Sequence, residues 1–457
     1  MLRIFRHYVS ATLLLLVLLD VAVIVTVVAL SGALAPWAEQ GPLWSKAAVL
    51  SVLVVFALYL ADLYEPHRQL GHRELIMRLF LSLAPAGLVA AALASAAPTF
   101  RLSQLTVVLT SGLFAIGLFL SRSVWNRVQW TEPLHERVLV IGVNRSAESI
   151  VALQSTGSRP FTVLGFLDDS PGAPDLLPSG SPLLGKTKDL LSFVEELHPD
   201  CVVVALAEMR TSFPANDLLD CRLRGIRVER WPTFHEQRTG KILLAELHAT
   251  WLIFSDGFVQ TRLTQIGKRV MDLILATVGL FGCLPVMGLV ALAIRLDSKG
   301  PVFFRQDRVG RNGRVFTLYK FRSMHATAEE QSGAVWASPS DPRITHVGRI
   351  LRRTRLDELP QLFNVLSGDM SFIGPRPERP EFVRILMQEI PFCMQRLSVK
   401  PGITGWAQVS HQYAASLDES VEKLQFDFYY IKNLSVFLDL VILLHTIPVV
   451  LFGRGAR

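Results

Sequence analysis

Two adjacent carboxylates, Asp357 and Glu358, lie within a segment (residues 300–410) that is dense in arginine, glycine and proline. Arginine carries a forked, permanent positive charge that suits phosphate oxygens. Carboxylates among so many cations should be ionised, so one of them can attack while the other holds a divalent metal. The pattern therefore predicts chemistry on a phosphate group. The arginines that we expect around the pair are Arg352, Arg353, Arg355 and Arg376.

An Asp-Glu pair also occurs on ordinary surface helices, where it forms ion pairs with neighbouring cations. The turns beside this pair, at Leu359-Pro360 and Gly374-Pro375-Arg376-Pro377, are unusual for such a helix. We therefore favour a phosphate site over a solvated helix face.

The composition indicates a membrane segment joined to soluble domains. The chain has 457 residues, of which 50% are hydrophobic and 19% charged, against about 25% charged in soluble proteins. The 85 charged residues (46 basic and 39 acidic) exclude a wholly membrane-buried transporter. The net charge of +7 suits an anionic membrane surface or phosphorylated substrates, and it is too diffuse to indicate nucleic acid. Four widely spaced cysteines indicate reduced thiols, not a zinc site or disulfide framework.

The first 130 residues predict four transmembrane helices, because each of four apolar runs approaches the roughly 20 residues that span a bilayer. The runs cover residues 9–31, 47–64, 79–97 and 104–121. Arginines precede the first run, separate the second from the third, and follow the fourth. The positive-inside rule then places both the N-terminus and the chain after residue 122 in the cytoplasm. A signal peptide is the alternative for the first run, but its apolar stretch is too long.

Residues 134–245 predict a Rossmann-like α/β domain, because short apolar strands alternate with helical stretches. The expected strands are 137–142, 161–167, 201–206 and 226–229, and the expected helices are 146–155, 186–197 and 216–224. The turn after the first strand has Gly142, but Asn144 and Ala147 replace the later glycines of a dinucleotide fingerprint. We favour a domain without ligand, serving as a spacer or homodimer contact, over a regulatory nucleotide site or a redox role.

A fifth apolar run, residues 270–294, has basic residues at both ends, which is typical of a segment whose two ends face the cytoplasm. Pro285 lies in its middle and removes a helical hydrogen bond there. We therefore expect a re-entrant helix over residues 268–296, broken at Pro285. The alternative is a fifth spanning helix, which would put residues 300–457 outside the cell.

The motifs resemble one family. The run from Arg352 to Ser371, followed by Gly374-Pro375-Arg376-Pro377-Glu378, is similar to the bacterial sugar transferases, the monotopic polyprenyl-phosphate sugar-1-phosphate transferases. The similarity extends from about residue 264 to the C-terminus. The preceding segments resemble the large form of the family, which starts exopolysaccharide chains. Residues 251–258 and 451–457 resemble the branch that accompanies PEP-CTERM exopolysaccharide clusters.

This resemblance implies a fold and a set of roles. It implies a membrane protein with a four-helix transmembrane bundle, a Rossmann-like cytoplasmic domain and an α-rich catalytic domain, residues 262–457, with a re-entrant membrane helix. Asp357 is then the nucleophile and Glu358 its partner, with both binding Mg2+. Pro285 matches the helix-breaking proline, although Leu284 stands where small members often have serine. The residues expected at the substrate phosphates are Arg352, Arg376, Lys320 and Arg322.

The implied reaction moves a sugar-1-phosphate from a UDP-sugar to polyprenyl (undecaprenyl) phosphate and releases UMP, at the cytoplasmic side of the bacterial inner membrane. One rival is a nucleotide-sugar dehydratase or epimerase, but no tyrosine here has a lysine four residues later, as such enzymes usually require. The other rival is a membrane scaffold or sensor of polysaccharide assembly, which leaves the packed arginine and acid motifs unexplained.

Overall fold

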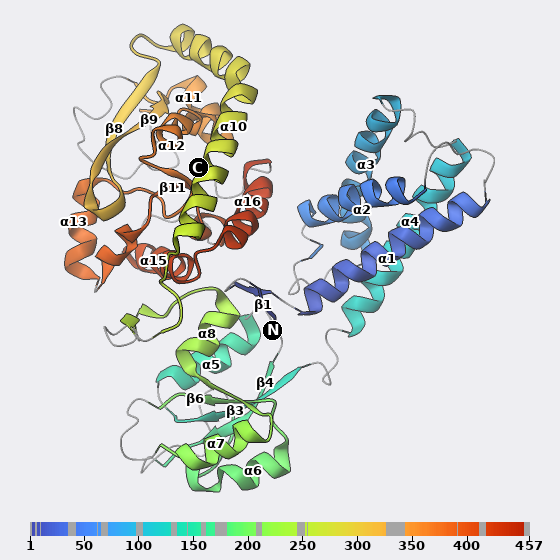
Figure 1. Cartoon of the computed structure of the whole chain (residues 1–457), viewed down its shortest axis with the longest axis vertical. Helices are drawn as coiled ribbons and strands as arrows, with labels where there is room; N and C mark the ends of the chain where they lie inside the picture. Colours follow the sequence, from blue (N-terminus) through green and yellow to red (C-terminus); the bar gives the residue numbers. More distant parts are fainter. Residues whose placement is uncertain are drawn as a thin grey trace. The chain divides into compact units, whose positions relative to one another are not determined.

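The computed structural model, drawn in Figure 1, divides near residue 240 into two compact units. The residues that the structure describes are 2–4, 7–9, 11–34, 43–61, 63–64, 72–96, 104–128, 135–143, 145–156, 161–169, 181–206, 213–244, 252–253, 255–325, 343–390, 392–410 and 417–451.

Four helices occupy the N-terminal part, after two short strands, β1 (Leu2–Ile4) and β2 (His7–Val9). The helices are α1 (Ala11–Leu34), α2 (Leu43–Leu60), α3 (His72–Ala96) and α4 (Gln104–Val128). Helix α1 packs against both α2 and α4, and α2 packs against α3, around fully buried side chains such as Ile24, Leu58 and Leu118. The apolar runs thus correspond to four helices, and their crossing of a membrane stays a prediction.

A buried ion pair lies inside these helices. Arg122 Nη2 of α4 contacts Asp20 Oδ2 of α1 at 2.7 Å, and the Tyr64 hydroxyl donates to the same oxygen at 2.7 Å. Asp20 therefore has two partners among these helices and the segment that follows α2. The fourth helix continues to Val128, beyond the end of the predicted apolar run at residue 121.

The α/β domain has a five-stranded parallel sheet in the order β5-β4-β3-β6-β7, which confirms the predicted α/β domain. The strands are β3 (Glu136–Ile141), β4 (Phe161–Leu167), β5 (Leu183–Gly185), β6 (Cys201–Val204) and β7 (Arg227–Arg230). The helices are α5 (Arg145–Thr156), α6 (Leu190–Leu197), α7 (Ala215–Leu223) and α8 (Trp231–Thr239). Strand β5 and helix α8 were not expected from the sequence.

The turn after β3 is closed by the domain's own carboxylate. Gly142 adopts a φ of +102°, and the Val143 amide donates to Asp168 Oδ2 at 3.2 Å. Asp168 directly follows β4, where an acidic residue in a dinucleotide-binding fold would meet a ribose. Asn144 lies outside the described residues. The Gly142 and Val143 amides thus both donate to groups of the same domain.

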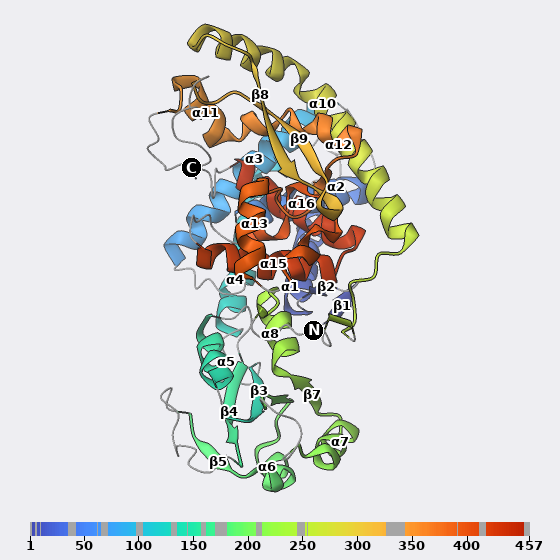
Figure 2. The ribbon, with the colours of Figure 1, turned by 90° about the vertical axis from the view of Figure 1, so that its left-hand side faces the viewer.

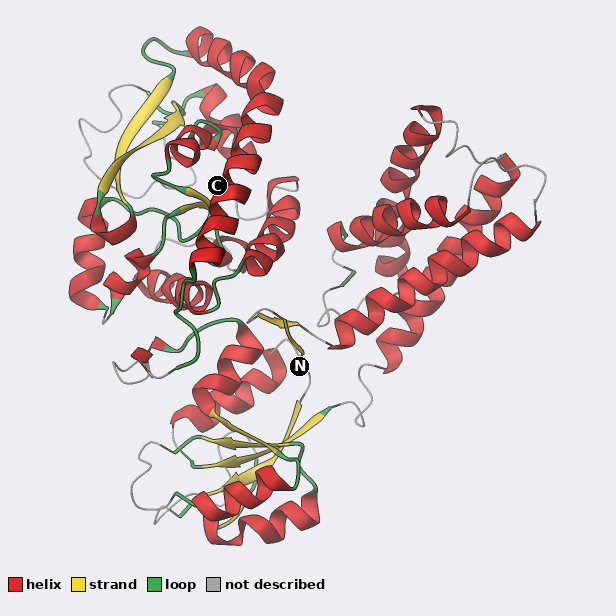
Figure 3. Cartoon of the chain, viewed as in Figure 1, coloured by secondary structure: helices red, strands yellow, loops and turns green. Residues whose placement is uncertain are grey.

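The second unit is mainly helical, with two small sheets (Figure 3). Strands β8 (Phe303–Val309) and β9 (Val315–Phe321) form an antiparallel hairpin, and β10 (Ser371–Ile373) pairs in parallel with β11 (Gly402–Thr404). The helices are α10 (Arg262–Asp297), α11 (His346–Thr354), α12 (Gln361–Ser367), α13 (Pro380–Glu389), α14 (Trp406–Ser410), α15 (Leu417–Lys432) and α16 (Val436–Leu451). Short 3₁₀ helices η6 (Arg311–Gly313), η7 (Leu356–Glu358) and η8 (Cys393–Ser398) join them.

Helix α10 is the one helix among the described residues that is long and apolar enough to cross a membrane. Many of its apolar side chains are exposed, including Val278 (67%), Phe281 (70%) and Leu289 (68%). The helix continues through Pro285, so the interruption expected there is absent. Its axis instead bends, and the two halves point in different directions (Figures 1 and 2). A bend is what the missing proline hydrogen bond permits without ending the helix.

Candidate active site

Helix α11 and the short helix η7 position the two carboxylates. The Thr345 side chain caps α11 by accepting from the Gly348 amide at 2.9 Å. A Cβ atom on Gly348 would lie 2.0 Å from the Ser323 carbonyl oxygen, so only glycine lets α11 lie this close to the end of β9. Arg355 then adopts a left-handed φ of +57°, which ends α11 and turns the chain into η7. Asp357 is consequently buried, with 9% of its surface exposed.

Two cations converge on Glu358. Arg376 Nη2 donates to Glu358 Oε1 at 2.8 Å, and Lys320 Nζ donates to the same oxygen at 3.2 Å. Lys320 lies on β9 and Arg376 follows β10, so three separate segments meet at this carboxylate. The structure thus brings together residues that are 18 and 38 positions from Glu358 in the sequence.

The two carboxylates differ in their electrostatics. Burial raises the pKa of Asp357 to about 6, against the opposing charges of Lys320 and Arg376. Burial would also raise the pKa of Glu358, but the charges of Arg376 and Lys320 outweigh it and hold that pKa below its usual range. Both groups are thus mainly ionised at neutral pH, as the sequence predicted. Asp357 therefore has the higher proton affinity of the two.

A buried asparagine fixes the strand that carries Lys320. Asn364 on α12 is 1% exposed, accepts from the Tyr319 amide at 3.1 Å and donates to the Thr317 carbonyl at 2.8 Å. Its amide thus pairs with β9 as a neighbouring strand would. This role of Asn364 was not expected from the sequence, where the signal for it is an amide residue within an otherwise apolar helical motif.

The other expected residues lie at different places. Arg352 is on the last turn of α11, and its charge lowers the pKa of Asp357, which puts it near the pair. Arg322 is buried and donates to the Ser298 and Lys299 carbonyls at 2.8 and 3.0 Å, so it holds the end of α10. Its role as a phosphate ligand stays a prediction. Pro285 is in the exposed apolar part of α10.

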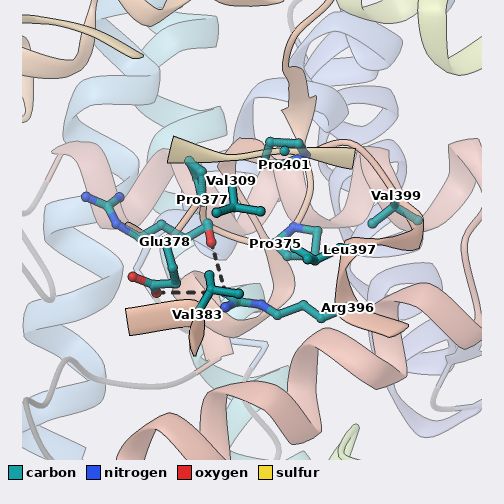
Figure 4. Close-up of a pocket in the computed structure, with 11 residues that line it drawn as sticks. Val309, Pro375, Pro377, Glu378, Val383, Arg396, Leu397, Val399 and Pro401 are labelled. Atoms are coloured by element: carbon teal, nitrogen blue, oxygen red, sulfur yellow. Dashed lines mark hydrogen bonds and ion pairs between the residues drawn. The ribbon is translucent and has the colours of Figure 1, made fainter. Parts of the chain in front are cut away.

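A small pocket lies beside Arg376 (Figure 4). Its walls are mostly apolar, and the polar groups on them are Arg376, Glu378 and Arg396. Arg376 thus contacts Glu358 with its guanidinium and also lines the pocket. Its remaining lining residues are Val309, Gly310, Pro375, Pro377, Val383, Leu397, Val399 and Pro401.

The donor set suits Mg2+ bound together with a phosphorylated substrate. The described residues contain no group of three or more His, Cys, Asp or Glu side chains able to form a metal cage. Mg2+ is commonly held by one or two carboxylates, with substrate phosphates completing its shell. The adjacent pair Asp357 and Glu358 fits that arrangement.

Comparison with known proteins assigns the family. The family model for bacterial sugar transferases matches residues 263–453, which include every site residue named above. A sugar transferase of Bacillus subtilis, EpsL, is 42% identical over 195 residues, covering 42% of this chain and 90% of the relative. The chain belongs to the bacterial sugar transferase family. The finer placement with PEP-CTERM clusters stays a prediction.

Two longer relatives have named activities. The UDP-N-acetylgalactosamine-undecaprenyl-phosphate N-acetylgalactosaminephosphotransferase of Aeromonas hydrophila is 46% identical over 52% of this chain and 56% of its own length. The undecaprenyl-phosphate glucose phosphotransferase of Komagataeibacter xylinus is 34% identical over 71% of this chain and 61% of its own length. The matched regions therefore span less than two thirds of either relative.

Proposed function

We propose that this sugar transferase moves a sugar-1-phosphate from a UDP-sugar to undecaprenyl phosphate, releases UMP, and so starts an exopolysaccharide chain. The observation that carries the proposal is the buried pair Asp357–Glu358 held among Arg376, Lys320 and Arg352. Relatives named for this reaction with N-acetylgalactosamine or glucose support it.

The reaction takes two displacements at one phosphorus atom. An ionised Asp357 oxygen attacks the phosphorus that carries the sugar, the bond from this phosphorus to the bridging oxygen breaks, and UMP leaves. An oxygen of the lipid phosphate then attacks the same phosphorus and displaces Asp357. Two steps let a soluble nucleotide and a membrane lipid use the site in turn.

The cations around the pair balance the charge in both displacements. Arg376, Lys320 and Arg352 offset negative charge that spreads over the phosphoryl oxygens. Glu358, kept ionised by Arg376 and Lys320, would hold Mg2+ with Asp357 and the donor diphosphate, where the metal would supply further positive charge. Burial and the hydrogen bonds to Glu358 keep the carboxylates and cations in position before the substrate binds.

The direct test measures UMP release by the purified full chain with Mg2+ and a panel of donors that includes UDP-glucose and UDP-N-acetylgalactosamine. We expect catalytic release with at least one donor when undecaprenyl phosphate is present. Without lipid, we expect a burst of about one UMP per active site, because the aspartyl intermediate accumulates. If folded, lipid-bound protein released no UMP with any donor, the proposal would be overturned. That result would favour a membrane scaffold or sensor of polysaccharide assembly.

We also propose that α10 enters the membrane and returns, so that the catalytic unit stays on the cytoplasmic side. Contacts at both ends of the helix support this. Lys268 Nζ donates to the Ile373 carbonyl at 2.8 Å and to Asp439 Oδ2 at 2.9 Å. Near the other end, Ile294 packs against Phe321 and Leu351 of the same unit. A straight 36-residue helix, about 54 Å long at 1.5 Å per residue, would separate its two ends across the bilayer.

Single cysteines at the two ends test this topology. We expect Gln265→Cys and Lys299→Cys, each in a Cys283→Ser background, to react with an impermeant maleimide in inside-out vesicles and not in intact spheroplasts. Both positions are exposed, and the other native cysteines, Cys201, Cys221 and Cys393, are buried. The Cys283→Ser parent serves as the control. Labelling of Lys299→Cys from the outer face would show that α10 spans.

A further inference from the structure

The turn that carries Arg376 is held by its carbonyl groups. Four consecutive carbonyls each accept a hydrogen bond, at 2.9 to 3.0 Å, and the donors come from three other segments, β8, η8 and β11. The donor and acceptor pairs are Gly402 N to Pro375 O, Arg396 Nη2 to Arg376 O, Arg308 Nη1 to Pro377 O, and Val309 N to Glu378 O. The backbone direction at Arg376 is therefore fixed from outside the turn.

The donor to the Arg376 carbonyl is itself oriented by a buried acid. Arg396 Nε donates to Asp427 Oδ2 at 2.7 Å, and the Arg396 and Asp427 side chains are only 10% and 2% exposed. Arg396 Nη2 also lies 3.9 Å from Glu378 Oε1. A dashed line marks this contact in Figure 4. A planar guanidinium held through Nε has little freedom to rotate, so its Nη2 points at one acceptor.

A buried ion pair of this kind is poor evidence for stability by itself, because desolvation of the two charges offsets their attraction. Its geometric effect is clearer. From Asp427 the contacts run through Arg396 to the backbone of Arg376, and the Arg376 side chain then reaches Glu358. Each link is a hydrogen bond of 2.7 to 2.9 Å with at least one charged partner.

We propose that Arg396 and Asp427 are positioning residues that aim the Arg376 guanidinium at the reacting phosphate, an inference that rests on the proposed transferase function. Neither residue touches the substrate in this scheme. Asp427 orients Arg396, and Arg396 holds the carbonyl of Arg376. A misplacement of about 1 Å in such a group is enough to lower turnover about 100-fold.

A double-mutant cycle tests the proposal by UMP release. We expect Asp427→Asn to lower kcat/KM about 10- to 100-fold in the wild-type background. On an Arg376→Lys background, which keeps a charge and is expected to keep measurable turnover, Asp427→Asn should lower kcat/KM less than about 3-fold, because its effect passes through the guanidinium of Arg376. Arg396→Lys keeps the positive charge but loses the planar guanidinium, and we expect it to lower kcat/KM as Asp427→Asn does. It replaces Asp427→Asn in the cycle if that variant fails to fold.

Glu422→Gln is the matched control, because Glu422 lies on the same helix α15 and pairs with Lys241. It should leave kcat/KM unchanged. If Asp427→Asn lowered kcat/KM equally on both backgrounds, and in proportion to a fall in Tm, Arg396 and Asp427 would have only a structural role. That result would overturn the inference. Failure of the proposed function is distinguishable, since wild type and control would then release no UMP.

Discussion

Asp357→Asn is expected to lower UMP release about 10⁴-fold or more, with or without the lipid acceptor, because an amide cannot form the aspartyl intermediate. The fold should survive. The pKa of Asp357 is higher in the folded chain than in the unfolded one, so ionising this side chain at neutral pH costs stability. Asparagine has nearly the same volume and no charge, and the Tm should stay level or rise slightly.

Asp256→Asn provides the control for this variant, because it removes an exposed acid of the same unit. Turnover by the control should match that of the wild type. The measurement is a rapid-quench time course of UMP, which separates the first-turnover burst from the steady rate. A burst of normal size in Asp357→Asn would reject Asp357 as the nucleophile, even if later turnover were slow.

The sequence alone was sufficient to predict the carboxylate pair and most of the cations around it, because these residues lie in compact motifs. The pairing of Arg376 and Lys320 with Glu358 joins three such motifs in space. Arg322 shows the limit of this reasoning. It is two residues beyond Lys320 and equally basic, yet β9 ends at Phe321 and the side chain binds the carbonyls at the end of α10. A motif identifies a donor, while the partner depends on tertiary packing.

Some bounds of the helices and strands were predicted correctly from the sequence, and others were not. The expected strand 161–167 coincides with β4, because an apolar, β-branched run has clear bounds. The expected third transmembrane run began at residue 79, whereas α3 begins at His72, since its first turn is polar and hydropathy alone does not register it. Asn364, Arg396 and Asp427 were not predicted at the site. Each acts on a segment distant in sequence, and a single sequence gives no such contacts.

Glu358→Gln tests the second carboxylate, and its first effect is on stability. The pKa of Glu358 is lower in the folded chain than its ordinary value of 4.5, so the ionised form stabilises the fold. Glutamine leaves Arg376 and Lys320 without this counter-charge, which should cost about 1–3 kcal/mol at pH 7. The difference in the free energy of unfolding between wild type and Glu358→Gln should be largest above about pH 4.5. It should shrink as the pH falls further, because Glu358 then becomes protonated in the wild type. Denaturant unfolding at several pH values measures it.

The larger effect of Glu358→Gln should be on turnover. With one carboxylate ligand left, we expect the Mg2+ concentration for half-maximal rate to rise about 10-fold or more, and kcat to fall about 100- to 1,000-fold. Glu389→Gln, an exposed change at the end of α13, should alter neither quantity. Assays at low temperature keep the variant folded, so lost stability does not mimic lost chemistry. An unchanged Mg2+ dependence alongside reduced kcat would mean that Glu358 serves only to hold Arg376 and Lys320 in place.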